Sequence, residues 1–441
     1  MYHFKIMPKN NDILRKAKKV HFIGIGGIGV SAIARMMLQE GKKVSGSDTS
    51  PSAITDELKK LRAKIFLGHK AKHVRNNADL VIYTPALAPD NPELKKAKKM
   101  RIPILSYPEA LGLISKNKYT IAISGAHGKT TTTAMIGKIL MDAKYDPTII
   151  VGSFLKDQKS NFVAGKGKYF VCEACEYKES FLNLSPKIIV ITNIDNDHLD
   201  YYKNLNNIKR AFAKFAGKLG NNDFLVCDKN NKNLRPVVKK TKCKIIDYSK
   251  IKADFKLKIP GEHNIKNAKA AMAVARILKI SSSISLKALN NFTGTWRRFE
   301  HKGKTKNGVL IYDDYAHHPT EIKATLKAAK SFFNQSSHIY CVFQPHLFSR
   351  TKLLFNDFGK SFNDADHVIV TDIYAAREKR DKKISGRKLA EVIKKHNQNT
   401  RYINSFDLIE KFLRKNTEKS DVIITMGAGN IFKVGENLLK K

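Results

Sequence analysis

The chain has 441 residues, 42% of them hydrophobic, which leaves room for about three domains that each bury a core. Its 81 lysines and arginines against 39 aspartates and glutamates give a formal charge of +42, which suits anionic ligands such as nucleotides. The basic residues are spread along the whole chain without a nucleic-acid-binding motif, so we expect a lysine-rich surface and no nucleic-acid partner. Five cysteines are too few for a disulfide scaffold, and we expect Cys172 and Cys175, a lone CxxC, to be buried or half-buried free thiols.

The N-terminal region has neither a targeting segment nor a membrane segment. Residues 1–12 lack the apolar stretch of a signal peptide. The most apolar window, residues 20–38, is rich in glycine and carries Arg35, unlike a membrane span. We therefore predict a cytoplasmic protein without a membrane partner.

A nucleotide-binding turn is predicted near the start of the chain. Residues 19–25 have the pattern of a buried strand, and a GxGxxG turn leads from them into a helix that runs to residue 38. A second strand, residues 43–47, ends at Asp48, so the segment has the strand–helix–strand order of a Rossmann-type unit. The default ligand is NAD with Asp48 on a ribose, but the same geometry serves any nucleotide diphosphate. The glycines of the turn are Gly24, Gly26, Gly27 and Gly29.

Three short apolar runs continue this unit, at residues 64–67, 79–84 and 104–106. Polar or helical segments separate them, so the sheet is predicted to be mostly parallel. His69 follows the first of these runs directly, where it either faces the ligand or lies on the surface.

The strongest signal is a phosphate-binding loop between an apolar run at residues 119–124 and a helix predicted at residues 132–142. Backbone N–H groups of such a loop point at an anion, Lys129 would reach the outer phosphates of a nucleotide, and the Thr130 hydroxyl would ligate Mg²⁺. The first glycine of a Walker A loop would fall at Ile123, so the turn is shorter than usual. The alternative is a glycine-rich turn that binds nothing, which a lysine followed by four threonines makes a poor explanation. The residues of the loop are Gly125, Ala126, His127, Gly128, Lys129, Thr130 and Thr131.

Acidic residues follow the next two predicted strands. Residues 165–172 lead to Glu173, a candidate metal ligand, and to Glu176, which we expect to be exposed. Residues 188–193 lead to a polar cluster that contains His198. A hard cation prefers oxygen ligands, so one histidine beside a nucleotide favours a mixed Mg²⁺ site over zinc. The alternative is that the acids of this cluster cap the next helix.

A helix predicted at residues 268–278 is preceded by His263 and Asn267. Their spacing of four puts both side chains on one helix face, where an imidazole and an amide could read an adenine edge. Helix capping by Asn264 is the alternative, and both roles can hold together.

The last part of the chain again alternates strands and helices. The adjacent Arg297 and Arg298 come first and could clamp a phosphate or a carboxylate. Strands are predicted at residues 309–312, 339–343, 367–371 and 421–426. We thus predict an α/β chain of three domains: a Rossmann-like N-terminal domain (1–118), a central P-loop ATPase-type domain (119–294) and a C-terminal Rossmann-like domain (295–441).

Eight segments, distributed in order over essentially the whole chain, resemble the Mur ligases. They are GIGGIG at 24–29, SGAHGKTTTT at 124–133, EACE at 173–176, TNIDNDHLD at 192–200, GEHNIKNA at 261–268, WRRFE at 296–300, DDYAHHPTE at 313–321 and FQPHLFSRT at 343–351.

The resemblance implies a role for each domain. In the N-terminal domain, UDP-N-acetylmuramate would replace NAD as the ligand, and its contacts would be Gly24, Gly26, Gly27, Gly29, Asp48 and His69, with Arg298 from the C-terminal domain. In the central domain, ATP would lie on residues 125–131, with His263 and Asn267 at the adenine, Thr130 and Glu173 on one Mg²⁺, and His198 on a second. The C-terminal domain would close over the site and bring His318, His346 and Arg350 to the reacting groups.

The implied reaction joins an acid to an amine. The lactyl carboxylate of the sugar nucleotide attacks the γ-phosphate of ATP, and the amine of L-alanine then attacks the resulting acyl phosphate. Lys129 would neutralise charge on the transferring phosphoryl group, and His318 or His346 would orient or deprotonate the amine, with no ranking between them. This chain has Leu347 where some members carry a basic residue, which leaves the carboxylate of alanine more dependent on Arg350.

Three alternatives stay open. A related ligase of the same family would add a recycled peptide to the same sugar nucleotide. An NAD-dependent oxidoreductase would explain the GxGxxG turn and Asp48, but not the phosphate loop. A P-loop ATPase stimulated by nucleic acid would explain the loop and the charge.

Overall fold

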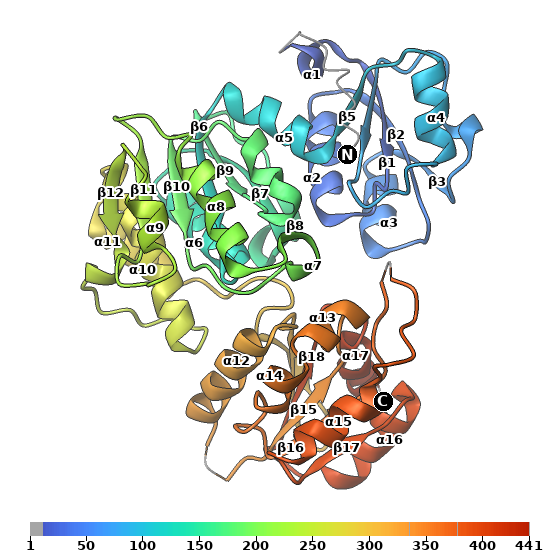
Figure 1. The fold of residues 1–441 in the computed structure, drawn as a ribbon, viewed down its shortest axis with the longest axis vertical. Coiled ribbons are helices and arrows are strands. Elements are labelled where there is room, and N and C mark those ends of the chain that lie inside the picture. Colours follow the sequence, from blue (N-terminus) through green and yellow to red (C-terminus); the bar gives the residue numbers. More distant parts are fainter. Residues whose placement is uncertain (1–11, 335, 377, 441) are drawn as a thin grey trace.

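The computed structural model describes residues 12–334, 336–376 and 378–440, arranged as three α/β units (Figure 1). Each unit is built around one sheet, as the sequence predicts. Residues 1–11, which include most of the segment predicted not to be a signal peptide, lie outside the described residues. Among the helices described, none has both the length and the apolar character that crossing a membrane requires.

The N-terminal sheet has five parallel strands in the order β3-β2-β1-β4-β5. The strand order reverses between β1 and β4, and ligands of open α/β sheets bind at such a point, outside the carboxyl ends of the strands. The elements of this unit are α1 (Ile13–Lys16), β1 (Lys19–Ile23), α2 (Ile28–Gln39), β2 (Lys43–Asp48), α3 (Ala53–Lys60), β3 (Lys64–Leu67), β4 (Leu80–Tyr83), α4 (Pro92–Lys99), β5 (Ile104–Ser106) and α5 (Tyr107–Lys116).

The central sheet has seven strands in the order β12-β11-β10-β6-β9-β7-β8, and β8 runs antiparallel to β7. β6 lies between β10 and β9, so the loops that follow these three strands meet at one edge. The elements are β6 (Tyr119–Ser124), α6 (Lys129–Asp142), β7 (Thr148–Leu155), β8 (Ser160–Val163), β9 (Tyr169–Glu173), β10 (Ile188–Ile191), α7 (Leu199–Tyr202), α8 (Leu205–Ala216), β11 (Phe224–Cys227), α9 (Arg235–Val238), β12 (Lys244–Asp247), α10 (Glu262–Ile277) and α11 (Ser282–Asn290).

The C-terminal sheet has six strands in the order β13-β14-β18-β15-β16-β17, with β13 antiparallel to β14. The elements are β13 (Glu300–Lys304), β14 (Leu310–Asp314), α12 (Pro319–Phe332), β15 (Ile339–Phe343), α13 (Phe348–Leu353), α14 (Phe355–Gly359), β16 (His367–Val370), α15 (Gly386–Lys394), β17 (Thr400–Tyr402), α16 (Phe406–Asn416), β18 (Val422–Met426) and α17 (Phe432–Lys440).

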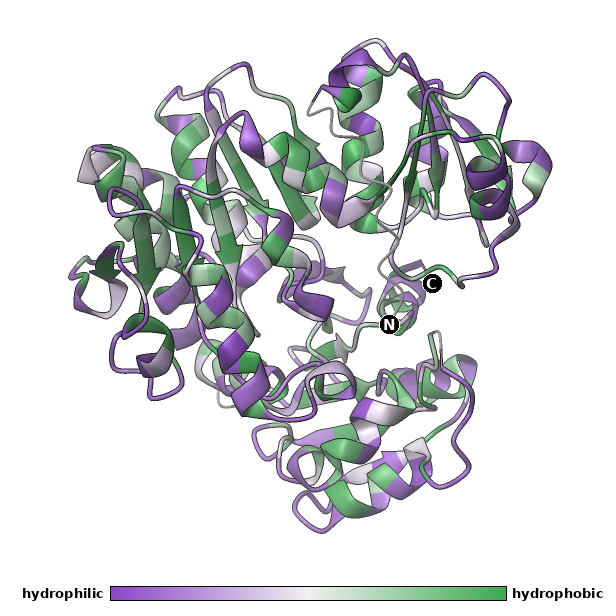
Figure 2. Cartoon of the chain, turned by 45° about the horizontal axis from the view of Figure 1, so that its top comes forward, coloured by the Kyte–Doolittle hydropathy of each residue, from purple (hydrophilic) through white to green (hydrophobic). Residues whose placement is uncertain are grey.

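The central strands of these sheets are uniformly apolar because helices cover both of their faces. All four residues of β10 and all five of β15 are buried, as parallel sheets require. In Figure 2 the strands of the N-terminal and central sheets are mostly green, whereas the helices around them carry purple residues. Four of the five free cysteines are buried; Cys175 is exposed, contrary to the expectation.

The three units are not joined in the same way. One continuous apolar cluster holds buried side chains of both the N-terminal and the central unit, such as Phe22 and Phe170, and α2 packs on β7 and β8. The buried apolar clusters described for the C-terminal unit, around Phe343 and Ile423, stay within residues 299–439. The C-terminal unit therefore meets the central unit largely through polar contacts.

Removing the Phe181 ring should destabilise the central unit. Phe181 is 1% exposed, and its ring stacks on Phe215 at 4.4 Å and meets Phe212 edge-on at 5.4 Å. Phe181→Ala should cost about 3–5 kcal/mol, because the cavity adds to the lost burial. Calorimetry should show a lowered unfolding transition. Phe332→Ala, at a side chain 51% exposed, is the control and should change stability by less than about 1 kcal/mol.

Candidate active site

The predicted phosphate loop lies between β6 and α6, and its backbone conformation requires glycine. Gly125 has φ 132° and Gly128 has φ 84°, in the region that other residues avoid. A Cβ on Gly125 would lie 2.1 Å from Thr192 Oγ1, so no side chain fits there. α6 begins at Lys129, three residues earlier than predicted, and its N-terminus therefore faces the loop. Free N–H groups at a helix N-terminus form an anion site.

Asn193, at the end of β10, holds this loop from the side. Its Oδ1 accepts from the backbone N–H of His127 at 3.0 Å, and its Nδ2 donates to the carbonyl of His127 at 2.9 Å. The Thr192 hydroxyl donates to the same carbonyl. Asn193 was not predicted to be a functional residue, although its place as the last residue of the strand predicted at 188–193 was an available signal.

Lys129 is folded back onto its own loop. Its ammonium group donates to the carbonyl oxygens of Gly125 and Ala126 and to Glu176 Oε1, the last at 3.0 Å. Burial disfavours the charge, but Glu176 outweighs it and raises the pKa of Lys129. The loop thus carries a permanent cation whose partners in this conformation belong to the protein itself.

Glu176 is buried, at 2% exposure, which corrects the expectation that it is an exposed charge. Its Oε2 atom is buried without a hydrogen-bond partner. Glu176 Oε1 lies 3.7 Å from His198 Nε2, and the ligand atoms of Glu176, Asp197 and His198 all lie within 4.8 Å of one another. An unpaired buried carboxylate oxygen beside a second carboxylate and an imidazole has the donor set that suits a divalent cation.

The predicted metal ligands are gathered only in part. His198 belongs to the cluster with Glu176 and Asp197, whereas Glu173 accepts the backbone N–H of Gly152 at 2.5 Å. Thr130 is buried in the first turn of α6, next to Lys129. Glu176 was not predicted as a metal ligand. Its burial depends on contacts with residues far away in sequence, which the pattern around position 176 does not show.

The imidazole of His127 joins the phosphate loop to the C-terminal unit. Its Nε2 lies 3.1 Å from Asp195 Oδ2, and its Nδ1 lies 3.2 Å from Glu321 Oε1. Burial disfavours the charged ring, but the hydrogen bonds to the two carboxylates outweigh it and raise the pKa of His127 to about 9. The pKa of Glu321 is held well below its usual range, since His317 and His127 overcome the effect of its burial.

A cavity of about 420 Å³ opens beside this contact, between α6, α10 and α12. Burial lowers the pKa of His263 to about 4, so its ring is neutral at the cavity wall. α10 begins at Glu262, so His263 and Asn267 both lie within that helix. The Thr132 hydroxyl of α6 donates to Asn267 Oδ1 at 3.2 Å. The volume falls in the range of small-molecule sites. Among its lining residues are His127, Gly128, Thr131, Asn193, His263, Asn264, Asn267, Arg298, Asp314 and Glu321.

The two adjacent arginines have different roles. Arg297 is 3% exposed and buried in a structural network: its Nε donates to Asp313 Oδ2 at 2.7 Å, and its other nitrogens donate to the carbonyls of Gly427 and Gly429. The prediction that the pair forms a clamp is therefore wrong for Arg297. Arg298 was expected to contact the ligand of the GxGxxG turn. In the structure it lines the 420 Å³ cavity together with His263.

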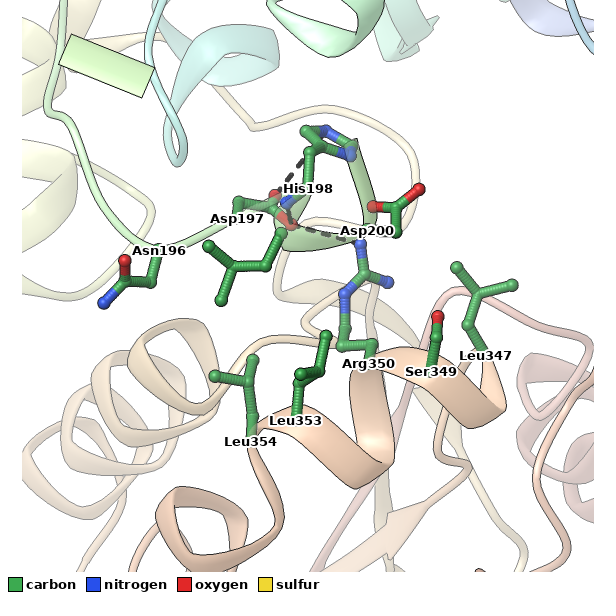
Figure 3. A pocket seen from close by; sticks show the side chains of 10 residues that line it. Asn196, Asp197, His198, Asp200, Leu347, Ser349, Arg350, Leu353 and Leu354 are labelled. Carbon is green, nitrogen blue, oxygen red and sulfur yellow. Dashed lines mark hydrogen bonds and ion pairs between the residues drawn. The ribbon is translucent and has the colours of Figure 1, made fainter. Parts of the chain in front are cut away.

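Arg350 reaches from α13 of the C-terminal unit to the loop that carries His198 (Figure 3). Its Nη2 lies 3.2 Å from Asp197 Oδ1, and its Nη1 lies 3.2 Å from His346 Nδ1. The side chains of Leu347, Ser349, Leu353 and Leu354 lie around it in the same view. His346 and Arg350, which were both predicted to reach the reacting groups, are in contact with each other.

His318 caps α12 and bridges two units. Its Nε2 lies 3.0 Å from the carbonyl oxygen of Asn196, and its Nδ1 accepts the backbone N–H of Thr320 at 3.3 Å. Burial, followed by the charge of His127, lowers the pKa of His318. A neutral ring that donates from Nε2 and accepts at Nδ1 has both nitrogens engaged.

The GxGxxG turn follows β1 at the point where the N-terminal sheet reverses its order. Gly24 has φ 77°, and a Cβ on Gly29 would lie 2.6 Å from the ring of Tyr107. The N–H of Gly26 donates to Asp48 Oδ2 at 2.8 Å. Gly27 is the residue before α2. The glycines therefore let the helix approach and let the Asp48 carboxylate close the turn.

His69 lies at the same edge, supported by an acid that sequence analysis missed. Its Nδ1 lies 2.9 Å from Ser47 Oγ and 3.5 Å from Glu93 Oε1. Glu93 is fully buried and also meets His21 at 2.8 Å and His73 at 3.3 Å. Burial would raise the pKa of Glu93, but the hydrogen bonds from His21 and Ser47 outweigh this effect and lower the pKa.

Comparison with known proteins gives a consistent match along the chain. Residues 19–119 match the model described as "Mur ligase family, catalytic domain", residues 123–254 the Mur ligase middle domain, and residues 297–429 the "Mur ligase, glutamate ligase domain". Curated UDP-N-acetylmuramate–L-alanine ligases of Clostridium acetobutylicum and Clostridium tetani are similar at 45% and 46% identity. The matches cover 98% and 97% of this chain and 99% of each relative.

Solved structures agree. The crystal structure of the UDP-N-acetylmuramate–alanine ligase of Thermotoga maritima superposes with a TM-score of 0.82 at 30% identity, covering 96% of this chain and 98% of that one. A murein peptide ligase of Psychrobacter arcticus has the same fold, with a TM-score of 0.73 at 23% identity over 96% of this chain and 98% of that one.

The raised pKa of His127 predicts a pH-dependent contribution to stability. A group whose pKa rises from 6.5 to about 9 on folding stabilises the folded state fully below 6.5, and loses that effect as the pH passes about 9. His127→Ala should therefore lower the free energy of unfolding at pH 6 by about 1–3 kcal/mol, and much less at pH 10. Denaturant unfolding of both proteins at the two pH values measures the difference. An equal loss at pH 6 and pH 10 would contradict the charged state of the ring.

Proposed function

The chain belongs to the Mur ligase family, and we propose that it joins L-alanine to the lactyl carboxylate of UDP-N-acetylmuramate with consumption of ATP. The observation that carries this proposal is the 45% identity to curated ligases of that name over 98% of the chain. The reaction is the first addition of an amino acid to the peptidoglycan precursor. It would take place in the cytoplasm, where ATP and the sugar nucleotide meet.

The work is divided among three domains, for which we propose the limits 1–118, 119–294 and 295–441. The separate sheets built from β1–β5, β6–β12 and β13–β18 support this division. The sugar nucleotide would bind at the GxGxxG turn with Asp48 and His69, beside the strand-order reversal. Arg298 is better suited to the ATP cavity, because it lines that space with His263.

ATP would lie with its phosphates on residues 125–131 and its base in the 420 Å³ cavity. The helix N-terminus and Lys129 supply positive charge at the phosphates. The neutral ring of His263 and the amide of Asn267 lie along the same wall and can meet an adenine edge.

The donor set around His198 fits Mg²⁺. Glu176 offers an unpaired oxygen, and ligand atoms of Glu176, Asp197 and His198 lie within 4.8 Å of one another. Thr130 and Glu173 would hold the other Mg²⁺, nearer the loop. When bound, the ion would offset negative charge on the phosphates.

The chemistry then needs two steps. The lactyl carboxylate attacks the γ-phosphate and ADP leaves, while Lys129 exchanges Glu176 for the transferring phosphoryl oxygens. The free amine of L-alanine attacks the acyl carbon, phosphate leaves, and the amine proton passes to a base. His346, which lies beside Arg350, and His318, which lies at the start of α12, are the two candidates for that proton. Arg350 would exchange Asp197 for the carboxylate of alanine.

Phosphate release tests the substrates. With ATP, Mg²⁺ and UDP-N-acetylmuramate, we expect release to require L-alanine, and chelation of the metal to abolish it. Each other amino acid and the tripeptide of the recycling reaction should support less than about a tenth of that rate. Release that depends on the tripeptide instead would favour the recycling ligase. Quenching of NADH fluorescence, or stimulation by random DNA, would point to the other classes.

Lys129→Ala should lower kcat by at least about 10²–10³-fold, because a charge contact that strengthens in the transition state is lost. Lys138→Ala is the matched control: Lys138 lies on the same helix and pairs with Asp142 at 2.7 Å, away from the loop. Steady-state kinetics of both variants measure the effect. A Lys129→Ala enzyme with near wild-type kcat would dismiss the role given to this residue.

A further inference from the structure

His127 is the side chain of the phosphate loop that contacts another domain. Its backbone is already held by Asn193, so the imidazole is not needed to shape the loop. The ring instead lies between two carboxylates, Asp195 of the central domain and Glu321 of the C-terminal domain. Both ring nitrogens face carboxylate oxygens, so both must donate, and the two hydrogen bonds are charge-assisted.

Each carboxylate is anchored independently of His127. The other oxygen of Glu321 accepts the backbone N–H of His317 at 3.0 Å, at the start of α12. The Asp195 oxygen that meets His127 also accepts the Thr320 hydroxyl at 2.8 Å. The four side chains therefore form one hydrogen-bonded network. Glu321 and Thr320, in the first turn of α12, contact His127 and Asp195 of the central domain.

The same helix turn controls the position of the groups that handle the amino acid. His317 and His318 precede α12 directly, the ring of His317 lies 5.9 Å from that of His346, and His346 contacts Arg350. Moving α12 relative to the phosphate loop would therefore move this whole group relative to the acyl phosphate. No apolar cluster of the described residues joins these two domains, so polar contacts of this kind decide how they dock.

We propose that His127 is a positioning residue: through Glu321 it couples the ATP-holding loop to the domain that presents L-alanine. His127 would thus affect the binding of L-alanine, although it belongs to the loop that holds ATP. The inference rests on the proposed function for the identity of the amino acid, but not for the domain contact itself.

The test compares His127→Ala, Glu321→Gln and the double variant with the wild type. Losing one charge-assisted hydrogen bond should raise KM for L-alanine on the order of tenfold in each single variant. The dissociation constant for the ATP analogue AMP-PNP, measured by calorimetry on each enzyme alone, should change by less than about threefold, since the backbone and Lys129 hold the phosphates. The double variant should be no worse than the worse single variant by more than about twofold, because both changes break one contact.

Glu262→Gln is the matched control. Like Glu321, Glu262 is a glutamate in the first turn of a helix, but its side chain is 80% exposed. In the part of the chain that the structure describes, it forms an ion pair with Lys266 of the same helix. This variant should keep the wild-type KM for L-alanine. A fall in thermal stability without a change in KM would leave His127 a purely structural residue and overturn the proposal.

Other outcomes also decide. A weaker affinity for AMP-PNP that matches the rise in KM would make His127 a phosphate ligand and overturn the proposal, as would effects that multiply in the double variant. If the wild type shows no release of phosphate that depends on L-alanine, the proposed function fails, but the coupling is still measurable. In that case, small-angle X-ray scattering should show the double variant to be more extended than the wild type, because the contact between the two domains is lost; equal dimensions would overturn the coupling.

Discussion

The site depends on one neighbour relation in the central sheet: β10 lies directly beside β6. Ile191 pairs with Ser124 at their carboxyl ends, so the loop after β10 runs alongside the phosphate loop. Successive residues of that loop then serve different parts of the molecule. Asn193 holds the backbone of the phosphate loop, Asp195 meets His127, and Asp197 meets Arg350 of the C-terminal domain. A strand pairing buried deep in the core thereby determines the geometry of groups from two domains.

Charges in the site are balanced by contacts within the protein. Lys129 faces Glu176, His127 faces Asp195 and Glu321, and Arg350 faces Asp197. Each cation is thus desolvated and oriented by carboxylates of the protein itself. Preorganised charges of this kind need little reorganisation during reaction, which is the main source of electrostatic catalysis. The same pairing keeps partly buried charges from standing alone, which would cost several kcal/mol each.

The parts of this picture that could be predicted from sequence are those with local causes. A strand, a glycine turn and a helix lie within residues 119–142, so the phosphate loop follows from its own pattern; only the start of the helix was placed three residues late. Contacts between segments that are far apart in sequence leave no such local pattern, so the burial that they cause could not be predicted. Glu176 is buried because of packing around Lys129 and Tyr202, and Arg297 and Arg298 differ in burial although they are adjacent. Strands β7, β8, β11, β12, β13 and β17 were not predicted. Four of them, β8, β12, β13 and β17, are edge strands of three to five residues, and such short segments carry little periodicity.

The contrast between the two domain junctions follows from the same physics. The N-terminal and central domains share buried apolar surface, around Phe22 and Phe170, and separating them would expose it to water. The C-terminal domain meets the central one through hydrogen bonds and ion pairs, which water can replace at little net cost. A ligase that takes up substrates and releases products needs a junction that can separate as well as one that stays closed. The polar junction separates at the lower cost, and it lies where the phosphate loop meets the start of α12.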